Sequence, residues 1–250
     1  MLQAALNGDR DHPATPRSPQ AVASDARAAV DAGADVVHVH AFDLEGVQTL
    51  DGAACAAVVR AVRAECPATP VSLTTSAEIE PDPDRRLAVV AGWTELPDLV
   101  TANMGEEGVV ELCDLLMARG VGIEAGLLSL ADAERFVAFG VAERCARALV
   151  EPLDAEHEDA IRHAAAMERT LAEAGIRLEQ VHHGEGIASW AVNRRAIECG
   201  HGIRTGLEDT PVLPDGRIAS GNAELVATAA AMLRQRDAPS EPFSPWGVGD

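Results

Sequence analysis

The stretch Val36-Val37-His38-Val39-His40 decides the fold and points to a site. Three valines around two histidines predict a short buried strand, in which alternate side chains share a face, so His38 and His40 point the same way. Two imidazoles that converge at the end of a strand can hold a divalent metal, with Zn²⁺ the usual choice for nitrogen ligands. The alternative is two separately hydrogen-bonded histidines, one buried and one at the rim.

Outside this stretch, apolar runs and amphipathic segments alternate along the 250 residues. The expected strands are 2–6, 35–40, 70–75, 99–102, 121–124, 146–150, 178–181 and 202–204. The expected helices are 19–32, 51–65, 85–92, 105–119, 129–139, 154–174, 187–198 and 222–236, with Ser18, Ser129 and Asp154 as caps. This alternation predicts an α/β fold, a single-domain (β/α)8 TIM barrel over 1–236 with a C-terminal tail over 237–250. A doubly wound open sheet is disfavoured, because no Gly-x-Gly-x-x-Gly turn follows the first strand.

The composition excludes several classes of function. The net charge of −20 argues against a nucleic-acid surface, which needs clustered cations. All 20 basic residues are Arg, so no lysine Schiff base can form and pyridoxal phosphate catalysis is excluded. Because Tyr is also absent, acid–base work must fall to His, Asp, Glu, Ser, Thr, Arg or a metal.

Cysteine usage and hydropathy bear on location. The five cysteines are dispersed without a CxxC pair, which suits reduced thiols in the cytoplasm. Met1-Leu2-Gln3 runs directly into a strand pattern, so we expect no N-terminal signal. No apolar run approaches the ~20 residues of a membrane helix. We expect a cytoplasmic protein without a membrane or nucleic-acid partner, and a homo-oligomer, since such barrels commonly associate through their outer helices.

In a barrel of this kind, reactions occur at the carboxyl ends of the strands. Almost every expected strand end is polar or ionisable, whereas random placement would leave several apolar. The residues collected there are Asn7, His38, His40, Thr74, Thr75, Asn103, Glu124, Glu151, His182, His183, Arg204, Glu208 and Asp209. This collection supports both the barrel and an active site at its mouth.

Three residues at and after the end of the last expected strand add to the candidate site. Glu208 is the best third ligand, because two His and one carboxylate leave open positions for water or substrate; otherwise it is a loop carboxylate facing water. Arg204 could clamp a substrate carboxylate with two parallel hydrogen bonds, or neutralise nearby acids. Asp209 could be a general base, or only an anchor for Arg204.

Several motifs, in order along nearly the whole chain, carry a family resemblance. They are Ala5-Leu6-Asn7-Gly8, Ser18-Pro19, residues 32–40, Thr74-Thr75, residues 101–105, Ile123-Glu124-Ala125-Gly126, residues 202–209 and residues 222–226. Together they make the sequence resemble the β-keto acid cleavage enzyme family, which includes 3-keto-5-aminohexanoate cleavage enzyme. The resemblance implies a zinc-dependent barrel that condenses a β-keto acid with acetyl-CoA, then cleaves a carbon–carbon bond to give acetoacetate and a new CoA ester.

The resemblance also implies roles for individual residues. His38, His40 and Glu208 match the zinc ligands. The catalytic positions correspond to Arg204, Asp209 as the base, Thr74 and Glu124. The expected substrate-binding residues are Asn7, Arg10, Thr75, Thr101, Asn103 and His183. Arg10 stands where the characterised member has an acid that recognises an amino group, so we predict a substrate without a cationic amine.

Two points stay open from the sequence. His182 or His183 is either a proton shuttle or a structural histidine bonded to the backbone. A metal-dependent hydrolase would turn over substrate without CoA, and a non-catalytic barrel would bind metal and ligand without chemistry.

Overall fold

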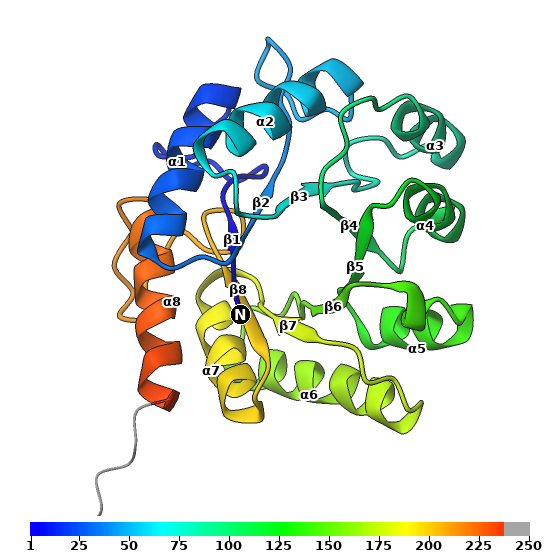
Figure 1. Ribbon diagram of the computed structural model, residues 1–250. Helices are drawn as coiled ribbons and strands as arrows, with labels where there is room; N and C mark the ends of the chain where they lie inside the picture. Colours follow the sequence, from blue (N-terminus) through cyan, green and yellow to red (C-terminus); the bar gives the residue numbers. More distant parts are fainter. Residues whose placement is uncertain (238–250) are drawn as a thin grey trace, which may run out of the picture.

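The computed structural model describes residues 1–237, which form a closed barrel of eight parallel strands in the order β1 to β8 (Figure 1). The strands are β1 (Leu2–Ala5), β2 (Val36–Val39), β3 (Val71–Thr74), β4 (Leu99–Asn103), β5 (Gly122–Leu127), β6 (Arg147–Val150), β7 (Gln180–His182) and β8 (Gly202–Thr205). The helices are α1 (Pro19–Ala32), α2 (Gly52–Glu65), α3 (Pro83–Ala91), α4 (Val109–Ala118), α5 (Leu130–Phe139), α6 (His157–Glu173), α7 (Ser189–Cys199) and α8 (Asn222–Asp237). The predicted (β/α)8 barrel is confirmed.

The barrel closes where β1 lies between β2 and β8. Gln3 pairs with Val36 on one side and with Arg204 on the other. Helices cover the outside of the sheet, so the strands are buried on both faces and read as nearly continuous apolar runs. Val37 and Val39 are fully buried in this way.

Two of the three predicted helix caps are confirmed. Ser18 and Ser129 accept backbone N–H bonds at the starts of α1 and α5. The prediction that Asp154 caps the sixth helix is wrong, since α6 begins at His157. Asp154 instead accepts a hydrogen bond from His163 Nδ1 at 2.7 Å.

Strand β5 continues three residues beyond its predicted end at Glu124. It can do so because the Asn103 amide packs directly over Gly126, where a side chain would have no room. Glu124 therefore lies inside the barrel rather than at a strand end, and it contacts Gln3 and Arg147 there. Its placement at the mouth of the barrel was wrong for this reason.

Other expectations bear on the remainder of the chain. All five cysteines are free thiols. Within residues 1–237, no helix combines the length and hydropathy that a bilayer crossing requires. The predicted C-terminal tail lies outside the described residues, apart from Asp237, which ends α8.

Candidate active site

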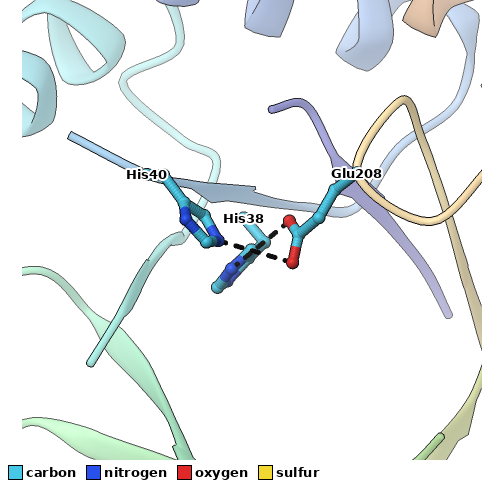
Figure 2. A group of neighbouring side chains, drawn as sticks. All are labelled: His38, His40 and Glu208. Atoms are coloured by element: carbon cyan, nitrogen blue, oxygen red, sulfur yellow. Dashed lines mark ion pairs between the residues drawn. The ribbon is translucent and has the colours of Figure 1, made fainter. Parts of the chain in front are cut away.

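Three side chains converge at the mouth of the barrel, as the sequence predicts (Figure 2). His38 and His40 extend from the end of β2, and Glu208 extends from the turn after β8. Glu208 Oε2 lies 3.5 Å from His38 Nε2, and Glu208 Oε1 lies 3.4 Å from His40 Nε2. The two rings meet edge to face, with centroids 5.3 Å apart. One carboxylate thus faces the same nitrogen of both imidazoles.

The tautomer of His38 follows from a chain of hydrogen bonds beneath it. Ser72 on β3 donates its hydroxyl proton to Glu124, because a carboxylate can only accept. Ser72 Oγ, 3.0 Å from His38 Nδ1, must then accept the proton on that nitrogen. The lone pair of His38 is therefore on Nε2, toward Glu208.

His40 is oriented in the same manner from another direction. Its Nδ1 bonds to the Gln48 side-chain oxygen, which can only accept, so Nδ1 carries a proton and Nε2 is the nitrogen turned toward Glu208. The backbone N–H of His40 donates to Asn7 Oδ1 at 2.8 Å, and Asn7 Nδ2 donates to the carbonyls of Pro16 and His40. Asn7 is buried and holds the end of β2 in place.

The strand–turn geometry after β8 brings Glu208 over the barrel. A Cβ on Gly206 would overlap the backbone of Ala5, so only glycine lets the two segments approach. The backbone N–H of Glu208 donates to the Ala5 carbonyl at 3.3 Å. A Cβ on Gly8 would lie 2.9 Å from Glu208 Cγ, so Gly8 leaves room for this side chain.

An arginine–aspartate pair lies beside these three residues. Arg204 Nε is 3.2 Å from both carboxylate oxygens of Asp209, and Arg204 Nη2 is 2.8 Å from Oδ1. Arg204 Nη2 also donates to Glu208 Oε1 at 2.5 Å. A single guanidinium thereby fixes the candidate base and the candidate metal ligand in one geometry.

Burial and charge oppose one another in this cluster, and charge prevails for the acids. Burial alone would raise the pKa of Glu208. Arg204, His38 and His40 lower it by more than burial raises it, so the pKa is well below its usual range. The pKa of Asp209 is likewise lowered, because Arg204 and His183 outweigh burial. Burial lowers the pKa of His38 to about 3. The site therefore holds two carboxylates and a neutral His38.

A fully buried histidine stands behind Asp209. His183 Nδ1 lies 3.4 Å from Asp209 Oδ1, and its Nε2 lies 3.6 Å from Glu151 Oε2. Burial raises the pKa of Glu151, and His183 and Arg204 oppose that rise. His183 thus contacts the candidate base.

A cavity of about 980 Å³ opens above these side chains. The predicted site residues that line it are Arg10, His38, His40, Thr74, Thr101, Asn103, Arg204, Glu208 and Asp209. The predicted site residues outside its lining are Asn7, Thr75, Glu124 and His183. Thr75 donates to the Thr101 carbonyl at 2.7 Å, so it supports the wall of the cavity from behind.

Sequence reasoning missed two residues that orient the imidazoles. Ser72 precedes Thr74 by two positions on the same strand, so strand alternation could have placed it on the same face. Gln48 lies in a polar loop after His40, where no periodicity predicts its direction.

Arg10 bonds to Glu185 and to the carbonyls of Glu208 and Asp209, so it ties two loops at the rim.

Comparison with solved structures shows the same architecture in other proteins. The apo structure of ObcA matches with a TM-score of 0.73 and 18% identity, over 90% of this chain and 63% of ObcA. Complexes of ObcA with oxaloacetate, and with a C4-CoA adduct and oxalate, match equally well by TM-score, at 0.73. The 3-dehydroquinate dehydratase of Aquifex aeolicus VF5 matches at 0.59 and 12% identity, over 94% of this chain and 98% of that one. At sequence identities this low, the comparisons show a shared fold and nothing more. The chain spans less than two thirds of the length of ObcA.

Fold and site together define a parallel (β/α)8 barrel with an ionisable cluster at the carboxyl ends of its strands. A family model described as beta-keto acid cleavage enzyme matches residues 1–243. The chain belongs to the beta-keto acid cleavage enzyme family. A search of curated proteins found no match to the sequence.

Proposed function

We propose that this protein is a zinc-dependent enzyme that condenses a β-keto acid with acetyl-CoA and cleaves a carbon–carbon bond, giving acetoacetate and a new CoA ester. The observation that carries the proposal is the convergence of His38, His40 and Glu208 beside the Arg204–Asp209 pair. Family membership supports the β-keto acid chemistry. The ObcA complexes, which contain oxaloacetate or a C4-CoA adduct with oxalate, support the two kinds of ligand.

The side chains present fit a zinc ion. His40 Nε2 and Glu208 Oε2 are buried atoms that have no hydrogen-bond partner within residues 1–237. The opposite nitrogen of each imidazole is already held, as is usual for histidines that bind metals. Two imidazoles and one carboxylate are a donor set of catalytic zinc sites. When bound, Zn²⁺ would polarise the keto group and stabilise negative charge on its oxygen.

The chain's own residues would position the substrate and move the proton. Arg204 uses Nε and Nη2 for Asp209 and Glu208, which leaves Nη1 for a substrate carboxylate. Asp209 is ionised and lines the cavity, so it can accept a proton from carbon beside a carbonyl. Thr74 Oγ1 accepts the N–H of Ser76, so its own proton remains available to an oxygen of the substrate.

Glu124 supports the site from below instead of contacting the substrate. It is fully buried and accepts a hydrogen bond from the Ser72 hydroxyl, which in turn orients His38. We therefore assign Glu124 a positioning role. His183, in contact with Asp209, has a similar role for the base.

The charge of the cavity limits where CoA can lie. Eight acidic residues and two arginines line it: Asp9, Glu78, Glu106, Asp132, Glu151, Glu185, Glu208, Asp209, Arg10 and Arg204. Both arginines are already paired with carboxylates. The phosphates of CoA would therefore remain outside the cavity, with only the acyl end of the thioester entering it.

A cytoplasmic location and a homo-oligomeric state stay predictions.

The proposal is tested by incubating the protein with acetyl-CoA and a panel of β-keto acids, and measuring acetoacetate and new CoA esters. We expect product with at least one acid, and loss of product in His38→Ala. No product with any acid would contradict the proposal. Turnover without CoA would instead identify a hydrolase, and recovery of intact ligands a binding protein.

A further inference from the structure

A second group of metal-binding side chains lies away from the cavity. Glu168 comes from α6, His182 from β7, and His201 from the turn between α7 and β8. One donor atom of each lies within 4.8 Å of the others. His201 immediately precedes β8, whereas Glu208 follows that strand, and His182 is the last residue of β7. Figure 1 shows α6, α7 and β7 side by side in this part of the barrel.

His182 offers a lone pair that nothing uses. Its Nε2 lies 3.0 Å from Gln180 Oε1, which can only accept, so Nε2 carries the proton and Nδ1 carries the lone pair. His182 is fully buried, and Nδ1 has no hydrogen-bond partner within the described chain. Burial lowers the pKa of His182 to about 3, so it is neutral at pH 7. A buried unpaired acceptor carries a free-energy cost, which a ligand would remove.

Glu168 and His201 supply two further donors. Arg195 Nη2 donates to Glu168 Oε2 at 2.5 Å, which leaves Oε1 facing His201 Nε2 at 3.2 Å. Burial raises the pKa of Glu168, but Arg195 and His201 beside it lower the pKa by more, so the carboxylate is ionised. The side chains of His201 and Glu168 are 20% and 24% exposed, which gives an ion and its water ligands access.

We propose that Glu168, His182 and His201 form a second zinc site, separate from the one at the mouth of the barrel. Two imidazoles and a carboxylate suit Zn²⁺, with water completing the coordination. The atoms of the ligands that would not face the ion are hydrogen-bonded, as in known metal sites. Gln180 Oε1 accepts a hydrogen bond from His182 Nε2, and Arg195 donates one to Glu168 Oε2.

Binding requires a local rearrangement of one ring. The imidazoles of His182 and His201 are stacked, with centroids 4.6 Å apart and planes 9° from parallel. Lone pairs lie in the ring planes, so the rings must tilt for both to reach one ion. His201 is the ring that moves, because it lies on a turn and is partly exposed, whereas His182 is locked in β7. The ion would link α6 to β7 and to the turn before β8, so its role is structural.

The test counts zinc in a protein without the first site. In a His38→Ala/His40→Ala background, we expect one zinc per chain by competition with a chromophoric chelator. Adding His201→Ala should abolish that zinc, and adding Glu168→Gln should weaken its binding at least ~10-fold. His157, exposed at the start of α6, is the matched control, and His157→Ala should leave the zinc bound.

Thermal unfolding gives the second readout. Zinc should raise the melting temperature of the His38→Ala/His40→Ala protein, and the rise should vanish when His201→Ala is added. Zinc absent from the His38→Ala/His40→Ala protein would overturn the proposal, as would an unchanged count after His201→Ala. Because the first site is removed throughout, these outcomes are independent of the proposed catalytic function.

Discussion

Ser72 links the barrel interior to the candidate metal centre through His38. Its hydroxyl oxygen accepts a hydrogen bond from His38 Nδ1, and its O–H donates one to Glu124; all three residues are buried. A hydrogen-bonded partner of this kind fixes both the ring orientation and the tautomer of a metal-binding histidine. The direction of His38 therefore depends on side chains that never reach the cavity.

Ser72→Ala should weaken zinc binding at the mouth of the barrel about 10–100-fold, because His38 loses the partner that orients it. Zinc affinity measured by chelator competition checks this. Thr205→Val is the matched control, since Thr205 is an equally buried strand residue whose hydroxyl has no hydrogen-bond partner in the described chain. Equal affinities in the two variants would show that Ser72 does not orient His38.

Asp209→Asn tests the base directly. Asparagine keeps the shape of the side chain and one oxygen for Arg204, but it cannot accept a proton at neutral pH. If Asp209 is the base of the proposed reaction, kcat should fall by a factor of about 10²–10⁴ with zinc content unchanged. Retention of wild-type kcat would assign Asp209 to anchoring Arg204, the alternative that the sequence leaves open.

At the scale of elements, the seam between β1 and β8 positions the site. Gly206 permits the close approach to Ala5, and Gly8 leaves space for Glu208. These glycines are required by contact between segments about 200 positions apart in sequence, not by a turn at either position. Small residues at the ends of neighbouring strands therefore set where the carboxylate lies.

Gly8→Ala should displace Glu208, because the new Cβ would lie 2.9 Å from its Cγ. We expect weaker zinc binding at the first site, with most of the stability retained, since a flexible side chain can yield. The control is Gly52→Ala at the start of α2, where the nearest atom to the added Cβ is 3.6 Å away. That change should stabilise the helix by up to ~1 kcal/mol. Unaltered zinc affinity in Gly8→Ala would contradict this account.

The alternation of strand and helix patterns along the chain, together with the helix-cap residues, predicted most of the fold. Val36–Val39 and the capped start at Ser18 lie where the sequence predicts them. The sequence pattern locates an element better than its end, and this produced the error at Glu124: the small and apolar residues from Ala125 to Leu127 do not show where the strand stops.

The sequence correctly predicted that His38, His40 and Glu208 lie close together, because the topology of a barrel places the ends of its strands at one mouth. It could not separate residues that line the cavity from those behind it. Asn7 and Thr75 are polar strand-end residues like Thr74, yet their side chains bond to backbone carbonyls. That difference depends on side-chain direction in irregular loops, which no pattern encodes.

At the scale of the whole molecule, the two histidine clusters lie in different surroundings. At the mouth, His38 and His40 face an ionised carboxylate beside a cavity. Before the start of β8, His201 stacks against His182 of β7, beside Glu168 of α6. Burial of a neutral histidine couples the free energy of unfolding of the whole chain to pH.

His182 should make the metal-free protein less stable as the pH falls from about 6.5 toward 3. Its pKa is about 3 in the folded state and near 6.5 when unfolded, so the unfolded chain binds the extra proton within this window. The free energy of unfolding should therefore fall by ~1.4 kcal/mol per pH unit below 6.5 from this residue alone, and the contribution is fully present above 6.5.

Urea unfolding between pH 7.5 and pH 5, with a chelator present, measures this dependence. His182→Gln removes the titrating group, so its stability should decline less steeply than that of the wild type by about the slope given by one proton. Groups that do not interact with His182 contribute equally to both proteins and cancel in the difference. His157→Gln, which removes an exposed histidine from α6, should keep the wild-type slope. Parallel curves for wild type and His182→Gln would mean that the His182 ring is protonated in the folded protein, or that water reaches it, and its assignment as a neutral metal ligand would be lost.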